Sequence, residues 1–420
     1  MEYGSVNPAW CVPSKRNAPR HFFMHRKRAE MRWNMKRFYT AESVTEGHPD
    51  KLCDLIADSV LDECLNGDSD ARVACEVLAT KGRIIVAGEI TSRQNPDVSE
   101  TVKRALEDVG YSPEGIRIDV FLHRQSPDIA EAVARSLEQR EGLSEKEDGW
   151  NAGAGDQGIM TGFACQETPS LMPMPVVLAN RIVRELSACR KSGYIAGILP
   201  DGKAQVTVEY EDGKPVRLSS VVVSCQHRED KGKRELEREI REKVLKPALH
   251  ILPPDEDTEV YINPSGRFVL GGPDADTGLT GRKLMVDTYG SMASRGGGAF
   301  SGKDCSKVDR CGAYMARYIA KNIVAAGLAE KCQVTLAYAI DVAEPVMVQV
   351  DTFGTGKVCA DDCLVMAVQR VFGLTPEQIA KKLRLKRPIY RQTAVFGHFG
   401  RKEFPWEQTD LAGKLKDTVM

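Results

Sequence analysis

The chain has no long apolar run and no excess of charge of either sign. No apolar stretch approaches the about eighteen residues that a membrane-spanning helix requires. Its 58 Lys and Arg nearly balance 59 Asp and Glu, giving a formal net charge of −1. No global field would therefore attract nucleic acid or an anionic membrane. With 42% apolar and 28% charged residues over 420 positions, the composition predicts a globular protein of two to three domains.

Paired cysteines are also lacking. The twelve cysteines form no CxxC pair and no zinc-ligand spacing. Dispersed thiols in a chain of this length indicate a reducing compartment rather than a disulfide framework, so we expect a cytoplasmic protein. Cys53, Cys64 and Cys75 recur every eleven residues and are predicted to fill the core.

Residues 1–37 differ from the rest because they carry nine Lys and Arg against Glu2 and Glu30. They have no apolar segment of the kind found in a secretory signal. An organelle transit peptide or a nucleic-acid arm is an alternative, although serines are few. We expect a disordered extension, or a start assigned too early with Met35 as the first residue.

Hydrophobic periodicity predicts a unit of helix, two strands and helix that occurs three times. The predicted elements are a helix from Pro49, strands 72–79 and 84–91, and helix 97–109; then helix 175–190, strands 205–210 and 216–224, and helix 233–249; then a helix from about 306 to 327, strands 333–340 and 346–353, and helix 361–371. The first helices of the three units start at residues 49, 175 and about 306, so they are almost equally spaced along the chain. Chance recurrence is the alternative, because helix–hairpin–helix order is common. We favour an α+β fold of three similar α-β-β-α domains, with mixed sheets covered by helices.

Three segments set carboxylates and cations among glycines: 46–51, 153–158 and 271–309. This mixture suits a polyanion held by lysines and by metal ions on aspartates, with backbone amides filling the gaps. A packed core has no need of it, so the segments predict nucleotide chemistry.

Two of these segments resemble nucleotide motifs without their context. Residues 153–158 fit GxGxxG, but no buried strand precedes them, and Asp156 would repel a pyrophosphate; it suits a ribose, an amine or a metal. Residues 297–303 match the P-loop spacing through Lys303, but Asp304 replaces the Mg²⁺-binding hydroxyl. We therefore predict a phosphate site of another kind, with Lys303, Lys307 and Asp309 as its charged groups.

His48 alone would be a helix cap or a surface imidazole. With Asp50 and Lys51 it makes the start of the helix a predicted anion site with a metal ligand. Glu76 and Glu89 lie in predicted strands, where each could simply point to solvent. Further cations stand in glycine-containing settings and either belong to one ligand site or are surface charge: Lys203, Arg267 beside Phe268, and Arg282–Lys283 near Asp276.

Together these segments resemble the S-adenosylmethionine synthase (methionine adenosyltransferase) family over residues 38 to about 411. The resemblance rests on 42–51, 153–158, 278–283 and 296–310. It implies three similar domains around a pseudo-threefold axis, in a homodimer or a dimer of dimers (homotetramer) with active sites at the subunit interface. The implied reaction converts ATP, L-methionine and water into S-adenosyl-L-methionine, diphosphate and phosphate. It also implies Mg²⁺, two ions per site, and one K⁺ per subunit.

The resemblance also assigns roles to residues. It implies catalytic roles for His48, Lys203, Arg282 and Lys303. ATP contacts are implied for His48, Asp201, Gly202, Lys203, Arg267, Phe268, Asp276, Arg282, Lys283, Ala299 and Lys303. Methionine contacts are implied for Glu89, Gln125, Asp156, Asp276, Lys307 and Ile340, and metal contacts for Asp50 (Mg²⁺), Asp309 (Mg²⁺) and Glu76 (K⁺).

The expected domain limits are 1–37 (extension), 38–135, 136–152 (linker and end of a gating loop), 153–270, 271–411 and 412–420 (tail). The residues alone leave 125–151 as either a surface linker or a mobile lid; the resemblance favours a gating loop from Gln125 to about Arg135.

The sequence departs from the family pattern at Asp341, where glycine is common, after Ile340 of the expected methionine pocket. Two rival functions remain: a phosphotransferase, which would release ADP, and a non-catalytic nucleotide-binding regulatory subunit. The second would show a gap among the implied catalytic and metal positions, and none is missing.

Overall fold

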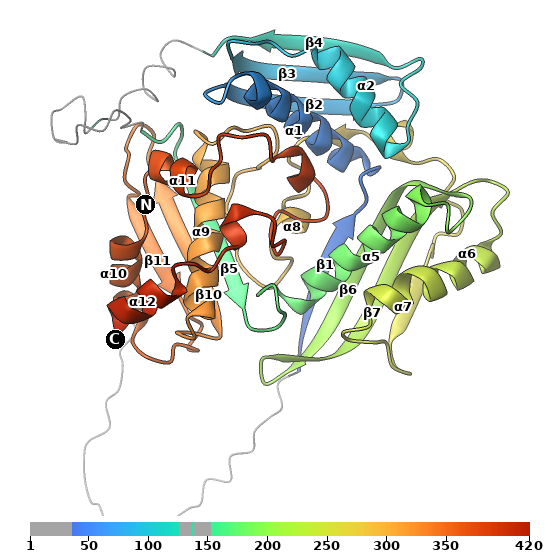
Figure 1. Cartoon of the computed structure of the whole chain (residues 1–420). Helices are drawn as coiled ribbons and strands as arrows, with labels where there is room; N and C mark the ends of the chain where they lie inside the picture. The colour runs from blue at the N-terminus through green and yellow to red at the C-terminus, as the bar shows by residue number, and fades with distance from the viewer. Residues whose placement is uncertain (1–35, 126–136, 138–152) are drawn as a thin grey trace, which may run out of the picture. The chain divides into compact units, whose positions relative to one another are not determined.

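The computed structural model of the chain describes residues 36–125, 137 and 153–420. Expectations for residues 1–35 and for most of the gating loop and linker lie outside these residues. Three sheets with packed helices make up the described part (Figure 1). No helix in these ranges is long and apolar enough to cross a membrane.

The N-terminal sheet has the strand order β4-β3-β2-β9. Its elements are β2 (Arg72–Thr80), β3 (Arg83–Thr91), β4 (Arg117–His123) and β9 (Gly278–Leu279), with helices α1 (Pro49–Gly67) and α2 (Val98–Val109). Strands β2 and β3 form a hairpin, and β4 joins β3 in parallel. Alternate residues of β2 such as Val73 and Val77 are buried, whereas Glu76 is exposed on the opposite face. One face is thus covered and the other is open.

The central sheet has the order β1-β6-β7-β8. Its strands are β1 (Arg37–Val44), β6 (Ile198–Glu211), β7 (Lys214–His227) and β8 (Glu259–Ile262), with α5 (Met174–Lys191), α6 (Lys233–Glu239) and α7 (Lys246–Ala248) on one side (Figure 1). The predicted single helix 233–249 contains a π-helical turn, Ile240–Leu245. Pro247 follows this turn and cannot donate a helical hydrogen bond.

The C-terminal sheet has the order β11-β10-β5. Its strands are β5 (Gly158–Cys165), β10 (Lys331–Tyr338) and β11 (Met347–Asp351). The helices of this part are α8 (Leu284–Asp287), α9 (Val308–Ala325), α10 (Asp361–Val371), α11 (Pro376–Lys382) and α12 (Ala412–Val419), with short 3₁₀ turns at Gly272–Asp274, Arg391–Thr393 and Pro405–Glu407. Residues 412–420, expected as a tail, thus include a helix whose Leu415 is buried.

The predicted order of helix, two strands and helix is present three times, which confirms the α+β fold of similar units. Each opening helix is preceded by a strand that pairs with the hairpin of another unit. Strand β1 pairs with β6, β5 with β10, and β9 with β2. The three units are therefore linked in a cycle by exchanged strands, and the sequence reasoning did not predict this.

The core runs through α1, α5 and α9 and the covered faces of the sheets. Cys53, Cys64 and Cys75 are buried, as predicted. Helix α1 is buried along most of its length, although it carries Asp50, Asp54 and Asp58. Charged groups in such a place need partners, and those partners lie in the candidate site.

Candidate active site

The N-terminus of α1 is formed by a short loop against β6. The amide of Thr45 donates to the carbonyl of Gly202 at 2.9 Å. His48 is the N-cap, and its Nδ1 accepts from the amide of Asp50 at 3.2 Å. Burial, with the charges of Lys283 and Lys203, lowers the pKa of His48 to about 3. The imidazole is therefore neutral near pH 7, with its proton on Nε2 and available for donation.

Asp50 joins this helix end to the loop after β9. Its carboxylate accepts from the amide of Leu279 at 3.0 Å and from Nζ of Lys283 at 2.7 Å. Nε of Arg282 lies 3.6 Å away. Burial acts to raise the pKa of Asp50, but the hydrogen bonds from Lys283 and Leu279 hold it below its usual value. The carboxylate stays ionised among cations.

Asp201 and Lys203 lie beside this helix end, on β6. Oδ2 of Asp201 accepts from the amide of Gly272 at 2.9 Å. Burial raises the pKa of Asp201, although Gly272 and Lys203 oppose the rise. Lys203 is exposed. Two further expected residues are held by backbone hydrogen bonds nearby. The backbone of Phe268 bonds to His227 at the end of β7. The amide of Asp276 donates to the carbonyl of Gly272, the residue that also binds Asp201.

We call these residues the helix-end group; its members are His48, Asp50, Asp201, Gly202, Lys203, Arg267, Phe268, Asp276, Arg282 and Lys283. Arg267 pairs with Glu229 and is exposed. All ten come from the ATP and metal positions expected from sequence.

A second group lies along β2. The carbonyl of Gly302 accepts from the amide of Cys75 at 2.9 Å, and the backbone of Lys303 forms an isolated antiparallel β-bridge with Ala74. Nζ of Lys303 contacts Oδ2 of Asp309 at 2.6 Å. Gly298 is required here, because a Cβ on it would lie 2.0 Å from Oδ1 of Asp309.

Glu76 stands on the same face of β2, where its side chain is exposed at the surface but partial desolvation by its neighbours raises its pKa and Lys303 opposes the rise. Beside it, a cavity of about 220 Å³ is lined by Arg72, Ala74, Glu89, His123, Arg124, Gln125 and Lys307. The structure thus brings together Glu89, Gln125 and Lys307, three of the expected methionine contacts. Glu89 Oε1 lies 3.1 Å from Nε2 of His123. The buried Oε1 of Gln125 has no hydrogen-bond partner among the residues that the structure describes.

We call Glu76, Glu89, Gln125, Lys303, Lys307 and Asp309 the strand-edge group. Among the described residues, no hydrogen bond or ion pair joins a member of this group to a member of the helix-end group. Most of the predicted site residues therefore form two groups within one chain.

Three further expected residues lie at the margins. Asp156 is exposed, and its Oδ1 accepts from the amide of Gln157. Ile340 is also exposed, and the adjoining Asp341 donates its amide to Ala154. Ala299 lies against Gly281, because a Cβ added to Gly281 would lie 2.5 Å from the Cβ of Ala299.

Sequence reasoning missed three aspartates that follow Asp50 on α1; Asp54 and Asp58 are buried and Asp62 is half-buried. Asp54 accepts from the amide of Gly281, Asp58 from the amide of Gly302, and Asp62 from the amides of Tyr390 and Arg391. The signal was present, because an acidic residue every fourth position in an otherwise apolar helix marks one buried, charged stripe.

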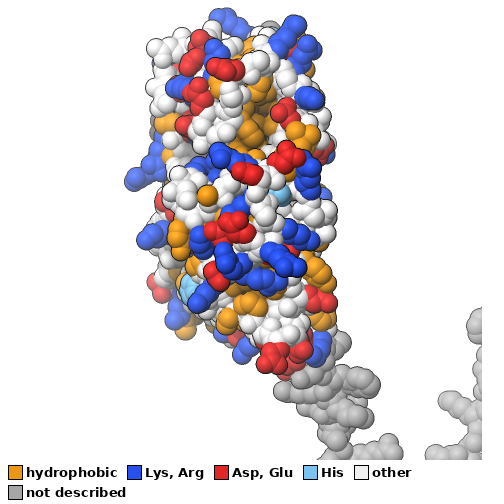
Figure 2. Space-filling model, turned by 90° about the vertical axis from the view of Figure 1, so that its right-hand side faces the viewer, with side chains coloured by type: hydrophobic (Ala, Val, Ile, Leu, Met, Phe, Trp, Pro, Cys, Tyr) orange, Lys and Arg blue, Asp and Glu red, His pale blue; other side chains and the backbone are white. Residues whose placement is uncertain are grey.

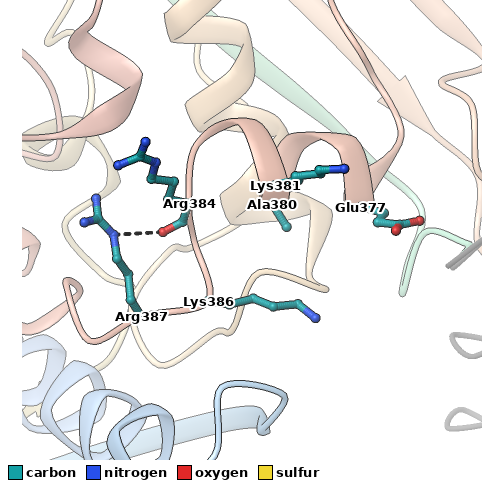
Figure 3. A pocket seen from close by; sticks show the side chains of 6 residues that line it. All are labelled: Glu377, Ala380, Lys381, Arg384, Lys386 and Arg387. Atoms are coloured by element: carbon teal, nitrogen blue, oxygen red, sulfur yellow. Dashed lines mark hydrogen bonds between the residues drawn. The ribbon is translucent and has the colours of Figure 1, made fainter. Parts of the chain in front are cut away.

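A larger cavity lies away from these groups. It measures about 380 Å³ and is lined by Glu377, Ala380, Lys381, Arg384, Lys386 and Arg387, on α11 and the following loop. Figure 3 shows Arg384 and Arg387 on one side and Lys381 and Lys386 pointing to the other, so these cations do not converge. Acidic and basic side chains are likewise interspersed on the face in Figure 2.

Comparison with known families matches three models, one for each part of the chain. Residues 36–133 match the S-adenosylmethionine synthetase N-terminal domain, 151–268 the central domain, and 270–408 the C-terminal domain.

Proposed function

The chain belongs to the S-adenosylmethionine synthetase family and is a methionine adenosyltransferase, and on that premise we propose how its residues carry out the reaction. The sulfur of methionine attacks C5′ of ATP, the triphosphate leaves, and water then cleaves it to diphosphate and phosphate. A thioether is neutral, so the attack needs no general base.

One observation carries this proposal: each group contains one aspartate in contact with one lysine. Lys283 Nζ lies 2.7 Å from Asp50, and Lys303 Nζ lies 2.6 Å from Asp309. Such pairs suit a ligand that brings both anionic oxygens and divalent cations, since lysine can bind the phosphates and the carboxylate the metal. In this proposal Lys203, Arg282 and Lys303 meet the charge that develops on the triphosphate.

His48 is uncharged and can therefore donate a hydrogen bond to the bridging oxygen of the leaving triphosphate. Its neutral imidazole can donate from Nε2 without adding a third cation to Lys283 and Lys203. The remaining help comes from alignment of sulfur, carbon and oxygen, which can lower a barrier by roughly 7–11 kcal/mol.

Asp50 and Asp309 would hold Mg²⁺, and the donor set fits this role. Within the described ranges no three His, Cys, Asp or Glu residues are grouped to hold a metal by themselves. Mg²⁺ commonly uses one or two carboxylates together with water and substrate phosphates. Bound there, Mg²⁺ would supply charge stabilisation of the leaving triphosphate. Glu76 offers one further carboxylate, for K⁺.

The remaining assignments are those that the family resemblance implies. Glu89, Gln125 and Lys307 would bind the polar end of methionine in the cavity of about 220 Å³, with Asp156, Asp276 and Ile340 as further contacts. Arg267, Phe268 and Asp201 would contact the nucleotide, together with Gly202, Asp276, Lys283 and Ala299.

The two groups would meet across a homodimer, alone or within a dimer of dimers. The open faces of the sheets carry apolar side chains: Phe121 is 63% exposed and Ile159 is 58% exposed. Such residues suit an interface between copies.

The products of ATP and methionine test the reaction type. Purified protein with Mg²⁺ and K⁺ should form diphosphate and orthophosphate in equal amounts, whereas ADP would favour a phosphotransferase. The substitution His48→Asn should lower kcat by about 10²-fold and change the Kd for ATP much less. Unchanged turnover would remove the role of His48.

Mixing two inactive variants tests the shared site. In Lys283→Ala the helix-end group is impaired, and in Lys303→Ala the strand-edge group. Unfolded and refolded together, they should recover roughly a quarter of wild-type activity, because half of the dimers are mixed and each mixed dimer has one intact site. No recovery, in a sample shown by native mass spectrometry to contain mixed dimers, would place the site within one chain.

A further inference from the structure

We propose that Asp54 and Asp58 of α1 are positioning residues that set the two loops carrying the triphosphate-binding cations. The proposal rests on the function proposed above. Neither aspartate is one of the expected ligand contacts, and both are 0% exposed, so they would act through the backbone of the loops.

Asp54 holds the loop that carries Arg282 and Lys283. Its Oδ1 accepts from the amide of Gly281 at 2.9 Å. Its Oδ2 lies 3.0 Å from Nζ of Lys51. Gly281 has φ +75°, a conformation that glycine adopts readily, and a Cβ there would lie 2.5 Å from that of Ala299. Gly281, which directly precedes Arg282 and Lys283, is thus held by Asp54 and packed against Ala299.

Asp58 holds the loop that carries Lys303 in the same way. Its Oδ1 accepts from the amide of Gly302 at 2.8 Å, and Arg310 binds both carboxylate oxygens at 2.7 and 2.8 Å. Gly302 has φ +78°, and a Cβ on it would lie 1.9 Å from the carbonyl oxygen of Cys75. Again a glycine in the left-handed region, anchored on α1, comes directly before a cation.

The spacing explains how one helix holds two loops. Residues four apart lie on one face of a helix about 6 Å apart, so Asp54 and Asp58 present carboxylates to neighbouring segments. A buried carboxylate that accepts a backbone amide makes a strong, directional bond. Gly281 and Gly302 lie outside the helices and strands. The loops also bond to β2 through Thr280 and Gly302, and the bonds to Asp54 and Asp58 fix the backbone directly before Arg282 and Lys303.

Helix α1 offers a control in Asp62, which is half-buried one turn beyond Asp58. It accepts from the amides of Tyr390 and Arg391 at 3.0 and 2.9 Å, so it also fastens a loop to α1. That loop carries none of the expected site residues. If the aspartates only stabilise the fold, loss of Asp54 or Asp58 should lower the melting temperature but should not raise the Kd for triphosphate more than loss of Asp62 does.

The test measures the affinity for inorganic triphosphate with Mg²⁺ by calorimetry, together with kcat and KM for ATP. We expect Asp54→Ala and Asp58→Ala to raise the Kd for triphosphate at least about tenfold and to lower kcat up to about 10²-fold, since small misplacements cost this much. Asp54→Asn keeps an acceptor for Gly281 and should recover most of the loss. Asp62→Ala should leave both quantities within about twofold of wild type.

Equal effects of Asp54→Ala and Asp62→Ala on the Kd for triphosphate would overturn the proposal, as would failure of Asp54→Asn to recover function. If Asp54→Ala does not fold, Asp54→Glu and Asp62→Glu are compared instead, because Glu keeps the charge beside Lys51 but displaces Gly281. Failure of the wild type to form S-adenosylmethionine would refute the proposed function, whereas the triphosphate affinities would still decide the positioning role.

Discussion

Asp341 adopts a left-handed backbone conformation, with φ +71°, directly after Ile340. This gives a physical reason why glycine would suit the position, since residues with a Cβ pay about 1 kcal/mol or more there and Asp somewhat less. The sequence showed an unusual residue in the expected methionine pocket, but only the backbone reveals its conformation.

We predict that Asp341→Gly stabilises the protein by up to about 1 kcal/mol and changes the KM for methionine. The melting temperature and steady-state kinetics check this. The control is Asp212→Gly, at another left-handed residue (φ +49°) in the hairpin turn between β6 and β7, which should not change the KM. A lower melting temperature for Asp341→Gly would contradict the account.

His398 is fully buried between aromatic rings and charged groups. Its Nδ1 lies 2.8 Å from the hydroxyl of Tyr314, and Nε2 lies 3.6 Å from Asp287. Burial, with the charges of Lys51 and Arg310, lowers the pKa of His398 well below its usual value. The folded protein therefore keeps this imidazole neutral, while the unfolded chain binds a proton as the pH falls below about 6.5.

It follows that His398 makes the free energy of unfolding fall as the pH drops from 6.5 towards 5, by up to about 1.4 kcal/mol per pH unit. His398→Gln should be less stable at pH 7.5 but should lose less stability on acidification. Urea denaturation at several pH values measures both. An identical pH dependence in the variant and the wild type would show that His398 binds a proton as readily in the folded state as in the unfolded chain, which would contradict the lowered pKa.

At the scale of elements, the loop glycines show why the sequence predicted which loops form the site but not which residues hold those loops in place. The glycine-rich composition predicted close backbone approach, and the structure places Gly302 against β2. The aspartates that receive these loops were missed because their partners are more than two hundred residues away in sequence. Periodicity reports only local order.

We predict that Gly302→Ala removes most activity and destabilises the protein by well over 1 kcal/mol, because the added Cβ would meet the carbonyl of Cys75. Gly327→Ala is the matched control: its φ is +74°, but no atom lies within 4 Å of the new Cβ. It should cost only about 1 kcal/mol and leave kcat unchanged. Calorimetry and kinetics compare the two variants, and equal losses of activity would contradict the assignment.

The long helices and the hairpins were predictable because their periodic patterns are local. Helix α10 matches its prediction at both ends (Asp361–Val371), and α1 begins at Pro49 as expected. Strands β1, β5 and β9 were not predicted. Each pairs with a hairpin distant in sequence, and β9 has only two residues, so neither pattern nor turn chemistry identified them.

At the scale of the whole molecule, the exchanged strands join the three units mechanically. Strand β1 makes eight paired positions with β6, so opening one unit removes a strand from another sheet. We predict one cooperative calorimetric transition for residues 36–420, with equal van't Hoff and calorimetric enthalpies per cooperative unit. Resolved transitions for separate units would contradict this coupling.

The division of the site residues into two groups is also a property of the whole molecule. Sequence could nominate their members from composition and resemblance, but not their partition, because that depends on how the three sheets are arranged. The open sheet faces and the two groups of residues are the observations behind the proposal that two copies of the chain share each site.

Mass spectrometry of the product tests the central claim most directly. Purified protein is supplied with ATP, Mg²⁺, K⁺ and methionine labelled with a heavy isotope on its methyl group. The account predicts a sulfonium product that contains the adenosyl group and the intact labelled methionine, and its absence in Lys303→Ala. Consumption of ATP without this sulfonium, or release of ADP in its place, would contradict it.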